Sequence, residues 1–193
     1  MNDSDIKPVP PALEAIEQDT QRIGFTMGSE RRTGSLLRTL AASKPAGRIL
    51  ELGTGTGIGT AWLLAGMNAN AKLDSVDSDA SALEIAKRHL GHDQRVTFHL
   101  MHGERFLSET HAQYDLIFAD AWGGKFNHLE EALALLRVGG IYLIDDLLPQ
   151  PTWPQDHAPN VAALIKDLQS RQNFAVTKMV WASGLMIVVR TRE

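Results

Sequence analysis

The sequence predicts an α/β fold built on a mostly parallel sheet with helices on both faces. Short apolar runs alternate with amphipathic helical stretches from Arg48 to about Arg171, a pattern that builds parallel sheets. The runs YDLIF and IYLI are continuously apolar, as in strands that are covered on both faces. The segment FAVTKMVWASGLMIVVRTR indicates two further strands joined by Ala182-Ser183-Gly184, which is a hairpin signal.

The N-terminal part precedes this alternation. Residues 1–11 contain three prolines and scattered charges, so we expect a flexible arm. Residues 12–46 should form a helical cover. Leu13 and Ile16 share one face of a first helix at about 12–22, and Ser29 is placed to cap a second one that ends at KPAG.

The alternating part divides into strands and helices. We expect strands at 48–52, 72–76, 95–100, 114–120 and 139–146, followed in turn by helices at 58–67, 80–90, 103–109, 128–137 and 160–171. With the C-terminal hairpin they form a doubly wound, Rossmann-like sheet of seven strands. Its last strand is antiparallel, because a three-residue connection cannot make a parallel crossover. We predict a single domain over residues 1–193.

Composition limits the function. The formal net charge is −4 and cysteine is absent. The charge argues against nucleic acid as a partner. The lack of cysteine excludes disulfides, thiolate nucleophiles and cysteine-ligated zinc. There is no apolar run of membrane-spanning length and no apolar signal core at the N-terminus, so we expect a cytoplasmic protein without a membrane partner.

Carboxylates mark the ends of the predicted strands. Glu51, Asp77, Asp120 and the pair Asp145-Asp146 follow four of them, and Glu104 lies close to the end of the third strand. Ligands of such sheets bind beyond the carboxyl ends of the strands, so these acids are candidates for a site. The alternative is that they cap the following helices, which suits Asp79 better than an acid that precedes glycines.

The glycine-rich stretch ELGTGTGIGT indicates a sharp turn that a ligand approaches closely. Asp77 lies some twenty residues past it, a spacing that suits ribose hydroxyls. The dinucleotide fingerprint fails in both registers, because its third glycine would fall at Ile58 or Thr60. The phosphate-loop motif is also absent, because no lysine follows these glycines. Glu51 would repel a pyrophosphate and suit a cation.

The motifs LELGTGTGIGT, SVDSD, FADAW and LIDD together resemble those of the class I S-adenosylmethionine-dependent methyltransferases. More narrowly, they resemble the small O-methyltransferases related to catechol and caffeoyl-CoA O-methyltransferases, over about Phe25 to Arg192. The resemblance implies S-adenosylmethionine as cofactor and in-line methyl transfer to a small hydroxylated acceptor.

The same resemblance assigns cofactor contacts. It places Glu51 and the glycine turn near the methionine portion, Asp77 at the ribose and the turn after the third strand beside the adenine. Trp122 would pack near the adenine, and Met27 would belong to a lid. The complete implied set is Met27, Glu51, Gly53, Thr54, Gly55, Gly57, Asp77, Ser78, Gly103, Glu104, Arg105, Asp120 and Trp122.

A metal and a base are also implied. In metal-dependent relatives the acids matching Asp120, Asp145 and Asp146 hold a divalent cation, here Mg²⁺, while capping without metal is the alternative. Those relatives place a lysine base three residues past the first acid. That position is Gly123 here, and the nearest lysine is Lys125. Either a longer turn returns Lys125 to the site or the base is absent; we favour the first, which makes Asp120 and Lys125 the catalytic candidates.

Other features leave alternatives open. No histidine pair has zinc-site spacing, although His102 and His128 lie near strand ends. The loop LLPQPTWPQDHAPN is predicted to wall the acceptor pocket, with a rigid surface connection as the alternative. Besides an O-methyltransferase, the chain could be a non-catalytic cofactor-binding regulatory module or, less favoured, an NAD-binding dehydrogenase. A homodimer is the assembly we consider.

Overall fold

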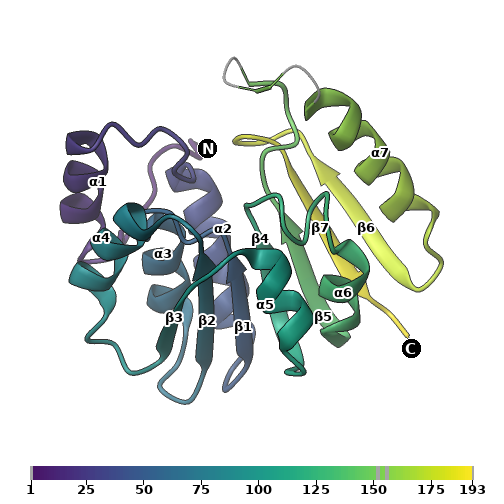
Figure 1. Cartoon of the computed structure of the whole chain (residues 1–193), viewed down its shortest axis with the longest axis horizontal. Coiled ribbons are helices and arrows are strands. Elements are labelled where there is room, and N and C mark those ends of the chain that lie inside the picture. Colours follow the sequence, from purple (N-terminus) through teal and green to yellow (C-terminus); the bar gives the residue numbers. More distant parts are fainter. Residues whose placement is uncertain (1, 151–152, 155–156, 193) are drawn as a thin grey trace.

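The sheet has seven strands in the order β3-β2-β1-β4-β5-β7-β6 (Figure 1). The computed structural model describes residues 2–150, 153–154 and 157–192. The strands are β1 Arg48–Leu52, β2 Lys72–Asp77, β3 Val96–Leu100, β4 Tyr114–Ala119, β5 Leu136–Ile144, β6 Phe174–Met179 and β7 Leu185–Arg190. Strands β1 to β5 pair in parallel, and β7 lies antiparallel to both β5 and β6. The predicted fold class, with its antiparallel hairpin strand, is confirmed.

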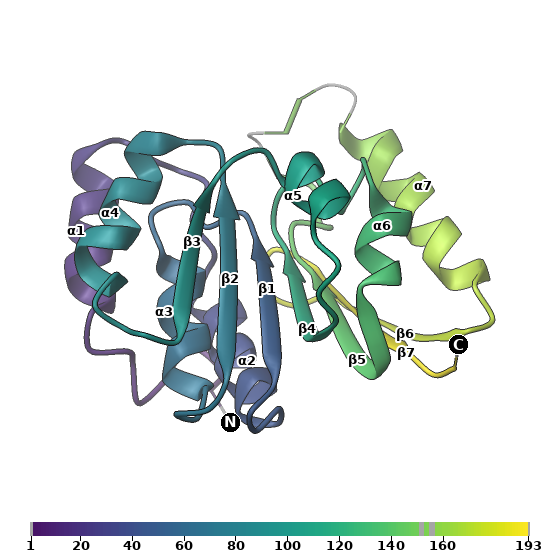
Figure 2. The same cartoon turned by 60° about the horizontal axis from the view of Figure 1, so that its bottom comes forward.

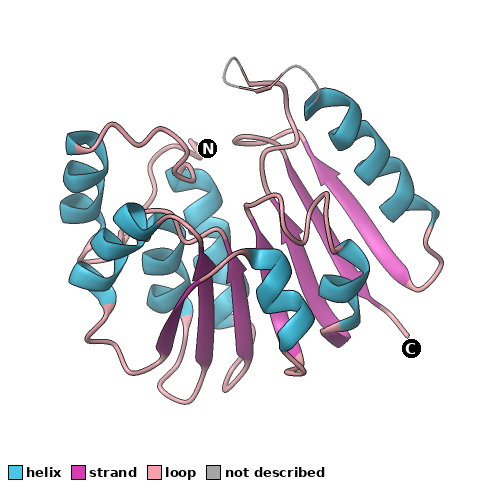
Figure 3. Ribbon diagram, in the orientation of Figure 1, coloured by secondary structure: helices cyan, strands magenta, loops and turns pink. Residues whose placement is uncertain are grey.

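Helices cover both faces of the sheet (Figure 3). They are α1 Leu13–Arg22, α2 Arg31–Ala42, α3 Ile58–Gly66, α4 Ala80–Leu90, α5 Gly103–Glu109, α6 Leu129–Ala134 and α7 His157–Ser170. In Figure 2, α5, α6 and α7 lie in front of the sheet, and α2 and α3 lie behind β1 and β2. This arrangement makes two apolar layers, one on each side.

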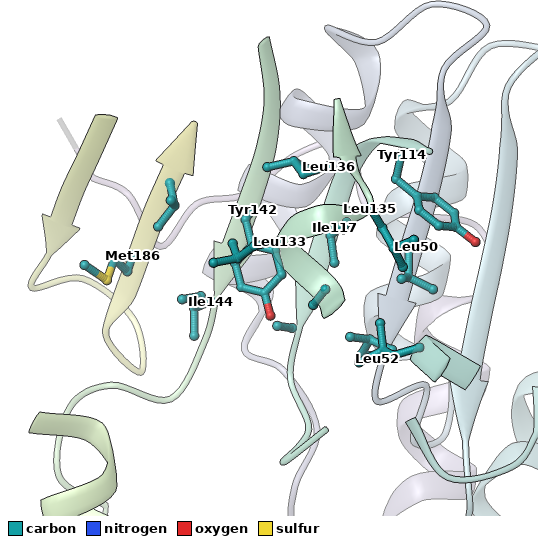
Figure 4. Close-up of a cluster of buried hydrophobic side chains, with 14 of the residues drawn as sticks. Leu50, Leu52, Tyr114, Ile117, Leu133, Leu135, Leu136, Tyr142, Ile144 and Met186 are labelled. Carbon is teal, nitrogen blue, oxygen red and sulfur yellow. The ribbon is translucent and has the colours of Figure 1, made fainter. Parts of the chain in front are cut away.

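Strand periodicity divides the side chains of β1 between these layers. Leu50 and Leu52 belong to the cluster under α5, α6 and α7, where Tyr142 and Ile144 of β5 also lie (Figure 4). Ile49 belongs to the opposite cluster, with Trp62 of α3. Successive side chains of a strand point to opposite faces, so Glu51 points to the same side as Ile49. The last acid of β1 therefore faces α3.

Several element boundaries differ from the sequence prediction. Helix α6 ends at Ala134, and β5 already begins at Leu136, which pairs with Tyr114 before a register shift. Gly139 takes a left-handed conformation (φ +78°) within β5. Helix α7 begins at His157. The expected cap at Ser29 is wrong, because the N-cap is Glu30 and no side chain caps α2.

The N-terminal arm contacts the body of the protein. The indole N–H of Trp181 donates to the Asp3 carboxylate (2.6 Å), Arg38 donates to the carbonyl of Pro8, and Pro10 is buried. Within the described residues, no helix is long and apolar enough to cross a membrane. The single domain and the cytoplasmic location stay predictions.

Candidate functional site

Two adjoining cavities lie at the carboxyl edge of the sheet. The larger, of about 340 Å³, is lined by residues that follow β1, β2, β3 and β4. The smaller, of about 210 Å³, is lined by residues that follow β4 and β5 and by the entry to α2. Four residues line both: Met27, Gly28, Ser29 and Asp120. The order of strands reverses between β1 and β4, which is where ligands of such sheets bind.

The glycine turn after β1 forms one wall of the larger cavity. Gly53 has φ +102°, and a Cβ atom there would lie 2.6 Å from the carbonyl oxygen of Asp120. Only glycine combines this backbone conformation with such a close approach. At the end of the turn, a Cβ on Gly59 would lie 2.6 Å from Oε1 of Glu51. These glycines therefore let the turn approach the end of β4 and let α3 approach Glu51 of β1.

Asp77 braces this turn from the end of β2. Its Oδ2 accepts a hydrogen bond from the backbone N–H of Gly55 (2.7 Å), and its Oδ1 accepts one from the N–H of Asp79 (2.8 Å). Each oxygen keeps acceptor capacity, and the residue lines the larger cavity. Asp79 caps α4, accepting from the N–H groups of Ser81 and Ala82.

Glu51 is buried beneath the turn. Its Oε2 accepts hydrogen bonds from the hydroxyls of Thr60 (2.5 Å) and Ser75 (2.5 Å), while Oε1 has no hydrogen-bond partner. Burial raises the pKa of Glu51 to about 7, and the two hydroxyls and the charge of Asp77 only modify that effect. The side chain is 0% exposed and does not line either cavity.

Most of the predicted cofactor residues line the larger cavity. They are Met27, Gly53, Thr54, Gly55, Asp77, Ser78, Gly103, Glu104, Asp120 and Trp122. Three do not line it. Glu51 lies below the turn, Gly57 packs against Ala86 of α4, and Arg105 pairs with Glu109 (2.7 Å) on the exposed side of α5.

Nine other lining residues are not named individually in the predicted set, although three of them belong to the predicted glycine turn. These are Phe25, Gly28, Ser29, Thr56, Ile58, Gly59, Val76, Ala121 and Gly123. Most of them are next to a predicted residue in the sequence, so the predicted motifs already indicated their position. Ser29 is predicted from the sequence to cap a helix rather than to line a cavity. Of the two histidines near strand ends, His102 lines the larger cavity, whereas His128 lines neither of the two cavities.

Aromatic rings gather beside the cavity at Trp122, whose side chain is 43% exposed. Its ring meets those of Phe126 (5.1 Å between centroids) and His157 (5.6 Å) edge-on. The ring of Trp153 lies 4.4 Å from that of His157, tilted by 40°. The proline-rich loop thus packs against the loop after β4, and its Gln150 lines the smaller cavity. Residues 151–152 and 155–156 of this loop lie outside the described residues.

The loop after β4 folds Lys125 inward. Gly124 takes a left-handed conformation (φ +88°), and its carbonyl accepts a hydrogen bond from the hydroxyl of Tyr142 (2.5 Å). Lys125 is only 4% exposed, and its Nζ donates to the backbone carbonyl of Asp145 (2.8 Å). The longer turn therefore brings Lys125 next to the acids, but Lys125 is not among the residues that line either cavity.

The acids of β4 and β5 meet at the smaller cavity. Burial raises the pKa values of Asp120 and Asp145, and the negative charge of neighbouring acids raises them further, while Lys125 opposes this. Oδ2 of Asp120 accepts a hydrogen bond from the hydroxyl of Ser29 (3.0 Å). Oδ1 of Asp145 accepts from the Ser183 hydroxyl and from the N–H of Asp146. Ser29 thus ties the N-terminal cover to the strand-end acid.

The three predicted metal ligands, Asp120, Asp145 and Asp146, line the smaller cavity together. In the described part of the chain, no group of three or more histidine, aspartate or glutamate side chains is arranged to hold a metal ion. Asp120 and Asp145 each have one oxygen engaged by a serine, and Asp146 has a left-handed backbone (φ +64°). The predicted Mg²⁺ site on Asp120, Asp145 and Asp146 is not supported.

A family model described as a methyltransferase domain matches residues 50–147, just over half of the 193 residues. The chain belongs to this family. The resemblance to class I S-adenosylmethionine-dependent methyltransferases is thereby confirmed, and the matched segment contains the glycine turn and all the strand-end acids.

Curated relatives agree with this family. A Mycobacterium tuberculosis protein named a probable O-methyltransferase is 29% identical over 117 residues, which cover 58% of this chain and 52% of the relative. A relative from Mycolicibacterium vanbaalenii is 31% identical over 119 residues, with the same shares covered. The chain spans about half the length of the curated relatives it matches.

Solved structures share the fold of this methyltransferase domain over almost its whole length. The O-methyltransferase TomG of Streptomyces achromogenes, in complex with S-adenosylmethionine, is 22% identical with a TM-score of 0.84, covering 98% of this chain and 93% of that one. An O-methyltransferase of Bacillus cereus, in complex with S-adenosylhomocysteine, is 19% identical with a TM-score of 0.82, covering 97% and 94%.

Proposed function

We propose that this methyltransferase domain is an S-adenosylmethionine-dependent O-methyltransferase that acts on a small hydroxylated acceptor. One observation carries the proposal: the two cavities share the wall formed by Met27, Gly28, Ser29 and Asp120. A cofactor in the larger cavity and an acceptor in the smaller one would meet at this wall. Such a meeting aligns the acceptor oxygen with the methyl carbon and the sulfur, which in-line transfer requires.

The residues of the larger cavity fit this cofactor. Asp77 would accept hydrogen bonds from the ribose hydroxyls, and Glu104 and Trp122, which line the same cavity, would flank the adenine. The named ligands of TomG and the Bacillus cereus enzyme support the choice. Bound there, S-adenosylmethionine supplies a methyl group on a sulfonium sulfur, which passes to the acceptor oxygen while the electrons of the C–S bond return to sulfur.

Asp120 is placed to take the acceptor proton. It lines both cavities, and the hydroxyl of Ser29 occupies its Oδ2, which leaves Oδ1 for the acceptor hydroxyl. Its raised pKa makes it a stronger base than an exposed carboxylate. The Nζ of Lys125 donates to the backbone carbonyl of Asp145. Its positive charge also acts on Asp120 and lowers the pKa of that acid. No step of this proposal is assigned to a metal ion.

Two measurements test the proposal. Calorimetric titration should show binding of S-adenosylmethionine and S-adenosylhomocysteine but not of NAD. Binding of NAD alone would indicate a dehydrogenase instead. Transfer of a labelled methyl group to a panel of small phenols and alcohols should then be detectable. Cofactor binding without transfer to any member of a broad panel would favour a non-catalytic regulatory module.

A further inference from the structure

Helix α1 contacts the glycine turn through a buried hydroxyl. Oγ1 of Thr20 lies 2.7 Å from Oγ1 of Thr56, and both threonines are buried. The same oxygen of Thr20 lies 2.7 Å from the carbonyl oxygen of Ile16 in its own helix. A hydroxyl can donate to one group and accept from another, so Thr20 can serve both partners at once. The contact between the threonines spans 36 residues and joins the N-terminal cover to the turn.

Thr56 lies where the backbone of the turn is most unusual. Its neighbours Gly55 and Gly57 have φ of +52° and +95°. Glycine has more backbone freedom than any other residue, so such a turn keeps one shape only if contacts restrain it. Thr56 lines the larger cavity, whereas Thr20 lines neither cavity. Thr20 therefore restrains the cavity wall from outside the cavity.

Phe25 gives the turn a second contact from the end of α1. Its N–H donates to the carbonyl of Thr20 (3.1 Å). Its ring atom Cζ lies 3.2 Å from the place that a Cβ on Gly55 would occupy, and Phe25 lines the larger cavity. On the other side, the N–H of Gly55 donates to Asp77 (2.7 Å). The turn is thus held between the end of α1 and the end of β2.

The position of α1 itself does not depend on the Thr20 hydroxyl. Ile16 is fully buried in the apolar layer that α3 covers. Oδ2 of Asp19 lies 2.8 Å from Nε2 of His89 and 3.2 Å from a guanidinium nitrogen of Arg88. Both partners belong to α4, which lies beside α1 (Figure 1). Loss of the Thr20 hydroxyl should therefore leave α1 in place.

We infer that Thr20 is a positioning residue for the cofactor: its hydrogen bond to Thr56 holds the glycine turn in the shape that binds S-adenosylmethionine. A wall that is already ordered loses less conformational freedom when the ligand binds. The inference rests on the proposed function, because it assigns the larger cavity to that cofactor.

Calorimetric titration with S-adenosylhomocysteine tests this role, at a temperature where melting curves show each variant to be folded. Thr20→Val should weaken binding roughly three- to tenfold, the range that the net value of one hydrogen bond corresponds to. Thr20→Ser keeps the hydroxyl and should bind nearly as the wild type does. Thr39→Val on α2 is the control, because the Thr39 hydroxyl bonds only to the carbonyl of Ser35 in its own helix (3.0 Å). If Thr20→Val does not fold, Thr20→Ala takes its place.

A second background locates the effect. In Thr56→Val, the change Thr20→Val should cause no further loss, because the partner hydroxyl is already gone. An equal loss in both backgrounds would overturn the inference, and so would full affinity in Thr20→Val or the same loss in Thr39→Val. In steady-state kinetics, Thr20→Val should raise KM for S-adenosylmethionine and leave kcat nearly unchanged. A fall in kcat at constant KM would contradict a role in cofactor binding.

The remaining outcomes separate the inference from the proposed function. Methyl transfer with an affinity that ignores Thr20 would overturn the inference alone. The expected losses of affinity without methyl transfer to any acceptor would refute the O-methyltransferase and leave the role of Thr20 standing. No binding of S-adenosylhomocysteine by the wild type would overturn both.

Discussion

Replacing Glu51 by Gln should make the protein more stable at neutral and alkaline pH. Glu51 is fully buried, and burial raises its pKa from the ordinary 4.5 to about 7. Glutamine resembles the protonated acid, because its carbonyl oxygen can accept from Thr60 and Ser75 while its amide nitrogen replaces the unpartnered Oε1. The variant therefore removes the cost of ionising a buried carboxyl and keeps the shape.

The size of the effect follows from the two pKa values. Each tenfold change in proton affinity corresponds to about 1.4 kcal/mol, so the difference between 4.5 and about 7 amounts to roughly 3 kcal/mol of unfolding free energy. Below pH 4.5 both states hold the proton and nothing is lost. Between pH 4.5 and 7 the unfolded chain releases it first, so stability falls as pH rises. Above pH 7 the loss is complete and constant.

Urea unfolding at pH 5 and pH 8 measures this effect. The wild-type protein should lose stability relative to Glu51→Gln over that interval, by an amount approaching the roughly 3 kcal/mol derived above. The exposed Glu84→Gln on α4 is the matched control and should follow the wild type. Parallel stability profiles for the wild type and Glu51→Gln would refute the reasoning, because they would mean that Glu51 keeps an ordinary pKa in the folded protein.

Four further predictions concern the cavities. Asp77→Ala should weaken binding of S-adenosylhomocysteine by about 2–3 kcal/mol, the scale of hydrogen bonds to a charged group; an unchanged affinity by calorimetry would remove Asp77 from the site. Ser29→Ala should move the acidic limb of the pH–rate profile to higher pH, since the Ser29 hydroxyl lowers the pKa of Asp120; a limb that stays in place would speak against Asp120 as the base. Lys125→Met should also move this limb to higher pH with cofactor affinity retained, since the charge of Lys125 lowers the pKa of Asp120; a limb that stays in place would show that this charge is dispensable. A chelator should leave methyl transfer unchanged, because the proposed transfer from S-adenosylmethionine with Asp120 as base uses no metal ion; activity that is lost and then restored by Mg²⁺ would contradict this.

Local patterns were enough to predict the fold and most of the larger cavity. The alternation of strand and helix signals gave the sheet, and the short connection at Ala182–Gly184 required β7 to be antiparallel. The glycine turn and Asp77 are contiguous with the strands that position them. Their place at the carboxyl edge therefore followed from the strand assignment alone.

Long-range packing decided the rest. Ser29 meets Asp120 across 91 residues, a contact that its own segment, with an apparent capping signal, does not indicate. The place of Lys125 depends on a turn that Gly124 and Tyr142 fix together.

The sequence by itself determined which residue types stand at the ends of the strands. Only the tertiary structure decided which of them face a cavity and which are enclosed. Glu51 and Asp77 both end strands, yet Glu51 is buried against Thr60 and Ser75 while Asp77 lines the larger cavity. Burial depends on what packs over a side chain from distant parts of the chain, and burial sets both its pKa and its access to a ligand.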